Sequence, residues 1–154
     1  MPLLGQWFAS GQAPPVMAAA VTPALREWYR EGDQEELEYA AQRVAARLSL
    51  EALAADPSVV RRRVVLAADV DDVDVAVLDT PRGTVALGTP VPHRLWASAL
   101  VDDEDADVVV SAAATALPAA QHGDPDAAFA LDEAEATELG WFAVQEIPHL
   151  LELG

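Results

Sequence analysis

The sequence predicts an α+β or α/β fold, with one mixed sheet of about four to five strands packed by four to five helices. Two observations support this prediction. Short apolar runs bounded by proline, glycine or aspartate are typical of strands, and longer segments with apolar residues three or four positions apart are typical of helices. The expected order is β-α-α-β-β-β-β-α-α. At 154 residues, one domain over residues 1–154 is the simplest organisation.

The chain is expected to open with a short helix over residues 3–10, which places its leucines, tryptophan and phenylalanine on one side. Residues 16–21 form an apolar run between prolines, and we expect a buried strand there. Thr22 followed by Pro23 is a typical helix start, because the hydroxyl accepts from an early N–H and proline suits the first helical position. A short helix is therefore expected over residues 23–31.

The largest apolar face is expected on a long helix over residues 35–53. Asp33 and Glu36 have the spacing of a capping box, in which each side chain accepts from the other residue's backbone N–H. Arg43 and Arg47 lie on the other side of this helix and are expected to face water. The predicted apolar face consists of Leu37, Ala40, Ala41, Val44, Leu48 and Ala52.

Four more strands are expected in the middle of the chain, at residues 63–68, 75–78, 84–88 and 95–101. The first is a continuous apolar run, which is typical of a central strand covered on both faces. The next two are predicted to form a hairpin. Pro90 and Pro92 flank Val91, and because proline lacks an N–H we expect no regular ladder pairing there.

Two helices are expected in the last third of the chain, separated by a loop. The first begins at Asp102 or Asp103, and its apolar face continues to Pro118, which is expected to end it. Asp132 and Glu135 repeat the capping-box spacing and predict a second helix that continues toward the last proline.

The composition argues against several classes of function. The net charge is −17, from 26 acidic and 9 basic residues, so nucleic acid is not an expected ligand. The chain has no cysteine, which removes disulfides, thiolate nucleophiles and cysteine-ligated metals. We expect neither a signal peptide nor a membrane span, and hence a cytoplasmic location. No cofactor is expected, because glycine-rich phosphate loops are absent.

The sequence resembles an uncharacterised actinobacterial family, a domain of unknown function. The segments that carry the resemblance are VTPALREWYREGDQEELEYAA (21–41), RRRVVLAADV (61–70) and AVQEIPHLL (143–151). The resemblance implies a small cytoplasmic protein and no known activity, so no functional residue is carried over. Family members usually open with a strand before the segment matching residues 3–10, which predicts a native first strand before Met1. They also tend to carry a histidine at positions 99–101, and its absence here weakens a catalytic interpretation of that strand.

Acidic residues after two predicted strands are the best candidates for chemistry. Asp69, Asp71 and Asp72 follow one strand, and Asp102 and Asp103 follow another. Carboxylates are the ligands that Mg²⁺ and Ca²⁺ prefer, and parallel strands would bring both turns to one edge of a sheet. This arrangement predicts a divalent-metal-dependent, hydrolase-like site. The alternative is a solvated acidic turn in the first place and helix capping in the second.

Aromatic and basic residues provide the candidates for binding. Trp28, Tyr29 and Trp141 belong to neighbouring aromatic pairs on predicted helices, where adjacent side chains point about 100° apart and cannot be equally buried. Each pair therefore serves the core or exposes one member as an interaction patch. The arginines at 61–63 form a basic cluster, interpreted as a solvated entry to the next strand or as a site for a small anion or an acidic partner.

The favoured function is a non-catalytic protein-interaction or regulatory module of the bacterial cytoplasm. Its expected partner is another protein or a second copy of the chain in a homodimer. The competing function is the metal-dependent enzyme described above. Carboxylates converging in a pocket would favour the enzyme, and a flat apolar patch around Trp28 or Trp141 would favour the binding module.

Overall fold

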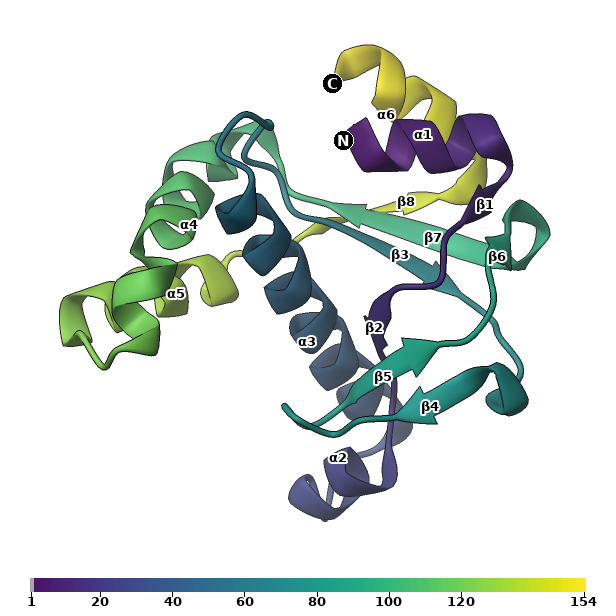
Figure 1. Ribbon diagram of the computed structural model, residues 1–154, viewed down its shortest axis with the longest axis horizontal. Coiled ribbons are helices and arrows are strands. Elements are labelled where there is room, and N and C mark those ends of the chain that lie inside the picture. The colour runs from purple at the N-terminus through teal and green to yellow at the C-terminus, as the bar shows by residue number, and fades with distance from the viewer. Residues whose placement is uncertain (1) are drawn as a thin grey trace.

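The computed structural model describes residues 2–154 and has an α+β fold, so the predicted class is confirmed (Figure 1). The strands differ from the prediction in their grouping. They form three small antiparallel sheets in place of a single mixed sheet. Among residues 2–154, no helix is both long and apolar enough to cross a membrane.

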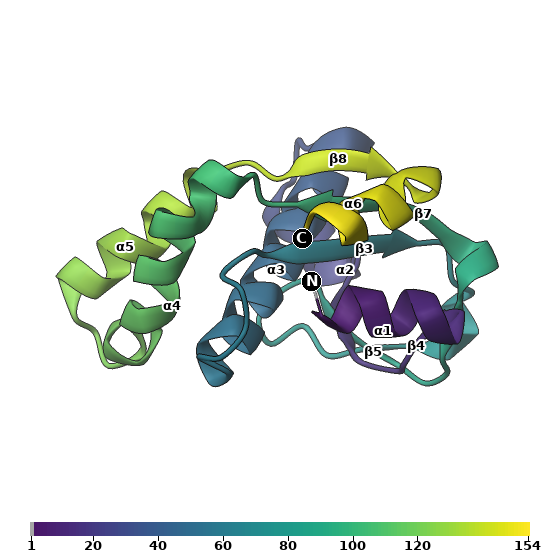
Figure 2. The same ribbon diagram turned by 90° about the horizontal axis from the view of Figure 1, so that it is seen from above.

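The central sheet consists of β3 (Val64–Ala68), β7 (Trp96–Val101) and β8 (Gly140–Ala143), in the order β3-β7-β8. Both pairings are antiparallel. The prediction that the strand at 63–68 is central is wrong, because β7 is central and β3 lies at an edge. Both faces of this sheet nevertheless carry helices (Figures 1 and 2).

A second sheet has the order β2-β5-β4. Its strands are β2 (Met17–Ala19), β4 (Val75–Val77) and β5 (Thr84–Leu87). The predicted hairpin between β4 and β5 is confirmed. β2 is shorter than the strand predicted at 16–21, and Met17 is exposed, so the expectation of a buried strand is wrong there.

The third sheet pairs β1 (Gln12–Ala13) with β6 (Val91–Pro92). No regular pairing was expected at Val91, and this is wrong, because Val91 and Pro92 pair with Ala13 and Gln12. The pairing is short, and just past Pro92 the backbone N–H of His93 donates to the carbonyl of Gly11. A two-residue bridge tolerates an edge proline, whereas a long ladder does not.

Helices α1 (Pro2–Ser10) and α6 (Ile147–Leu153) lie side by side over one face of the central sheet (Figures 1 and 2). Apolar side chains from both helices and from this face of the sheet form one core cluster. Its buried members include Leu4, Ala99, Val101, Ile147 and Leu150. Phe142 of β8 is half-buried and also packs there, so the odd and even residues of β8 point to opposite faces.

Helix α3 (Gln34–Ala55) lies on the opposite side of the central sheet (Figure 1). The predicted capping box is confirmed, since Asp33 accepts from the N–H of Glu36 at 2.9 Å and Glu36 accepts from the N–H of Asp33 at 3.1 Å. The face predicted for its second half is wrong: Ala52 is exposed, whereas Leu50 and Leu53 are buried. The burial shifts because this end of α3 packs against α4 and α5.

Helices α4 (Asp107–Gln121) and α5 (Pro125–Ala136) form a hairpin that projects from the rest of the molecule (Figure 2). Two predictions fail here. Pro118 does not end α4: it lies exposed within the last turns, and the helix continues to Gln121. Asp132 does not begin a helix; Asp124 caps α5 by accepting from the backbone N–H groups of the next turn.

The segment that follows α5 corrects another prediction. A helix was expected to run toward the last proline, but residues 140–143 form β8 and α6 begins only at Ile147. Pro148 lies in the first turn of α6, where its missing N–H is not needed.

The start of α2 (Pro23–Trp28) offers a test of the fold. Thr22 is buried; its hydroxyl accepts from the N–H of Leu25 at 3.3 Å and donates to Asp79 in the β4–β5 turn at 2.6 Å. We expect Thr22→Val to lower the free energy of unfolding by about 1–2 kcal/mol, because the cap and a buried hydrogen bond are both lost. Urea unfolding measures the change. The control is Thr115→Val on the exposed side of α4, and equal stability of the two variants would contradict the prediction.

Candidate functional site

The acidic residues proposed as metal ligands lie apart. Because β3 and β7 are antiparallel, Asp69 at the end of β3 and Asp102 at the end of β7 lie at opposite ends of the sheet. Asp69, Asp71 and Asp72 are exposed, and Asp103 is exposed at the other end. Within residues 2–154, no three histidine, cysteine or acidic side chains form a group that could hold a metal. A shared site would require β3 and β7 to run parallel, and they are antiparallel.

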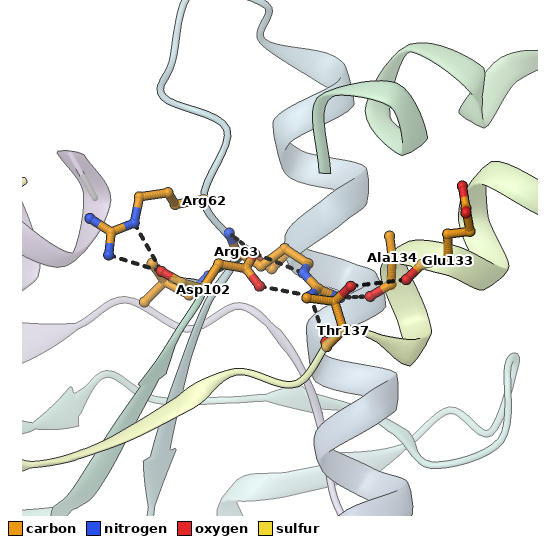
Figure 3. A network of polar contacts seen from close by, with 8 residues as sticks. Arg62, Arg63, Asp102, Glu133, Ala134 and Thr137 are labelled. Carbon is orange, nitrogen blue, oxygen red and sulfur yellow. Dashed lines mark hydrogen bonds and ion pairs between the residues drawn. The ribbon is translucent and has the colours of Figure 1, made fainter. Parts of the chain in front are cut away.

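Asp102 instead forms a buried ion pair with Arg63 (Figure 3). The side chains are 0% and 3% exposed, respectively. The carboxylate accepts from Nη2 of Arg63 at 2.7 Å, from Nε at 2.9 Å and from the backbone N–H of Arg63 at 2.7 Å. Two hydrogen bonds from one guanidinium group to one carboxylate fix the relative orientation of the two side chains as well as pairing their charges. The expected capping role of Asp102 is wrong, since both of its oxygens face Arg63.

The Arg63 guanidinium also joins the central sheet to α5 (Figure 3). It donates to the carbonyl of Ala134 at 2.8 Å and to that of Thr137 at 2.9 Å, both at the end of α5. These carbonyls belong to the helix terminus, which needs donors and favours positive charge. Arg62 donates to the carbonyl of Asp102, and Arg61 donates to that of Leu53. The prediction of a solvated arginine cluster is therefore wrong.

A cavity of about 110 Å³ lies between α3, the central sheet and the chain between α5 and β8. Its lining combines apolar side chains with charged groups. The lining includes Arg43, Arg47, Leu50, Val65, Leu100, Glu135, Glu138 and Leu139. Arg63 also lines it, but its guanidinium is engaged by Asp102, Ala134 and Thr137.

Two guanidinium groups share a single carboxylate in this cavity. Glu135 of α5 accepts from Arg47 at 3.2 Å and from Arg43 at 3.5 Å. Nε of Arg47 is buried without a hydrogen-bond partner in the described chain, and Glu51 at 3.6 Å is too far to provide one. Arg43, whose side chain is 50% exposed, provides the donors that a further acceptor can reach, whereas the buried Nε of Arg47 does not. The sequence does not predict this group, because Arg43 and Arg47 are expected to face water and Glu135 is distant from them in the chain.

Trp141 extends the apolar wall of the cavity onto the surface. It pairs with Leu100 across β7 and β8, and Leu100 pairs with Val65 across β7 and β3. Directly opposed residues point to the same face, so the three side chains form one row. Val65 and Leu100 line the cavity, whereas Trp141 is 63% exposed on the outer strand.

The other two aromatic candidates lie elsewhere. Trp28 is also 63% exposed, but Arg82 lies over its ring at 3.9 Å and occupies one ring face. Tyr29 is exposed at the end of α2 and lines a second, more open hollow of about 290 Å³. That hollow shares the lining residues Tyr39 and Arg43 with the cavity beside β8, so the two are separate neighbours along α3.

The profile of a family of unknown function, DUF6912, matches residues 1–151. The chain belongs to this family. The resemblance inferred from the three sequence segments is thereby confirmed at the level of a domain of unknown function. Comparison of this DUF6912 chain with curated proteins and with solved structures gives no match.

Proposed function

We propose that the protein is a non-catalytic protein-interaction module, and that the surface of β8 around Trp141 is its contact surface. The observation that carries the proposal is the exposure of Trp141 on an edge strand. Exposed tryptophans at the centre of an apolar surface are frequent binding hot spots. The row formed with Leu100 and Val65 continues this surface into the cavity.

The partner is a different protein in this proposal. Two copies of a chain with a net charge of −17 repel each other, which opposes a homodimer. The outer edge of β8 has no pairing strand among residues 2–154, so an added strand can pair with it at the start of β8; at its end the N–H of Ala143 donates to Glu146 at 2.7 Å.

Trp141→Ala is expected to reduce recovery of the partner by about thirtyfold, which corresponds to the loss of one interface hot spot. The measurement is quantitative affinity purification of the tagged protein from its own host, read by mass spectrometry. Trp28→Ala is the matched control, because Trp28 is equally exposed and lies on α2. Undiminished recovery with Trp141→Ala, or equal loss with Trp28→Ala, would contradict the proposal.

A further inference from the structure

We propose that the cavity beside β8 captures the C-terminal carboxylate of an extended partner segment, with an aliphatic last residue, that pairs with β8. This inference rests on the proposed function and specifies the chemistry of the partner. It follows from the donors in the cavity, from the cavity's size and from its position at the start of β8.

The donors favour a carboxylate. Arg43 and Arg47 are held near each other by one acceptor, Glu135, and the side chain of Arg43 is 50% exposed. The planar guanidinium group binds carboxylates through two parallel hydrogen bonds. A partner carboxylate would accept from the exposed Arg43 and compete with Glu135 for both arginines. Exposed Glu138 also lines the cavity, and two nearby carboxylates oppose a doubly charged phosphate more strongly than a single carboxylate.

The size of the cavity favours the end of a chain over a complete small molecule. Pockets for small molecules typically have volumes of about 300–1,000 Å³. This cavity has about 110 Å³, and an apolar cavity of about 150 Å³ holds one benzene molecule. The space therefore suits one aliphatic side chain, which would enter it past Leu139, the lining residue next to β8. The remaining affinity must come from contacts outside the cavity.

The position of the cavity gives the direction of the partner segment. Thr137, Glu138 and Leu139 line the cavity and lead directly into β8 at Gly140. A strand added antiparallel to β8 ends where β8 begins, so its C-terminus would lie beside the cavity. Trp141 lies next along the same strand and would contact the residues that precede the terminus. Backbone pairing then supplies affinity, and the cavity selects the last residue.

The test uses two libraries of fluorescein-labelled hexapeptides with randomised positions followed by a fixed terminal leucine. One library has a free carboxylate and the other a carboxamide. We expect the protein to select peptides from the first library only. A selected peptide, remade as the amide, is expected to bind about tenfold to a hundredfold more weakly by fluorescence polarisation, which is the effect of losing hydrogen bonds to charged groups.

Three variants test the residues themselves. Arg47→Gln is expected to weaken binding of the selected peptide about tenfold or more, because the neutral Gln amide cannot replace the charged guanidinium group. Arg94→Gln, an exposed arginine before β7, is the control and should leave binding unchanged. Glu135→Gln is expected to strengthen binding, because it removes the competing charge. A gain of affinity cannot arise from misfolding, so this variant keeps the test valid if Arg47→Gln is poorly folded.

The outcomes separate this inference from the proposed function. Equal binding of acid and amide peptides, or selection from neither library, overturns the inference, and Trp141-dependent capture of a protein in the same preparation leaves the proposed function standing. Binding of 4-methylpentanoate alone as tightly as the selected peptide also overturns it, since the cavity would then be a site for a free aliphatic acid. Weaker binding after Glu135→Gln contradicts the proposed competition with Glu135.

Discussion

Arg63→Met is expected to lower the free energy of unfolding by about 3–5 kcal/mol, the usual effect of removing one partner from a buried ion pair. Three N–H groups of Arg63 donate to the fully buried carboxylate of Asp102. The substitution removes the two from the side chain and keeps the one from the backbone. It also removes the donors to the carbonyls of Ala134 and Thr137. Methionine fills a similar volume, so the loss reflects the polar contacts more than a cavity.

Urea unfolding followed by circular dichroism measures this change, with Arg94→Met as an exposed control expected to stay within about 0.5 kcal/mol of the parent protein. A double variant, Arg63→Met with Asp102→Leu, should be less destabilised than the sum of the single variants, because neither buried charge is then left unpaired. A change below about 1 kcal/mol for Arg63→Met would show that the pair is not structural.

The Arg63 network also connects stability to the candidate site. Its bonds to Ala134 and Thr137 hold the end of α5, and the residues that follow line the cavity. Glu135, which both cavity arginines contact, lies between these two bonded positions in the chain. A loss of Arg63 should therefore disturb the cavity as well as the fold, and for this reason the binding test uses Arg47 and Glu135.

Local signals in the sequence predicted the helix starts where side chains act on their own neighbours. The Thr22-Pro23 start and the capping box of Asp33 and Glu36 need only residues within one turn. The same kind of signal at Asp124-Pro125 was assigned to a loop, because Pro118 was expected to end the preceding helix. Where a proline lies exposed in the last turns of a helix, the lost hydrogen bond is tolerated and the expected boundary shifts.

Long-range contacts account for most of what sequence analysis missed. In β8, apolar residues within only four positions fit a helical period and a strand period equally well, and pairing with β7 decides between them. The arginine run at 61–63 looked solvated, because Asp102 and the end of α5 are distant in sequence. Arg43 and Arg47 meet Glu135 only through the packing of α5 against α3. None of these contacts has a local sequence signature.

Ile147→Ala is expected to lower the free energy of unfolding by about 2–5 kcal/mol, the usual loss on truncating a fully buried Ile. Ile147 is 0% exposed at the first position of α6 and packs in the cluster that covers one face of the central sheet. A cavity between α6 and β8 would remain, because both elements are held in place by β7 and α1. Chemical denaturation with unchanged m-value measures the effect.

Leu153→Ala is the matched control in the same helix, since Leu153 is 66% exposed. Leu150, one turn after Ile147, is buried with it, whereas Leu153 faces solvent. A loss of less than about 0.5 kcal/mol for Leu153→Ala, together with the large loss for Ile147→Ala, would support the register of α6 against the sheet. Comparable losses at the two positions would mean that α6 packs through a different face, and the assignment of β8 as the strand beneath it would fail with it.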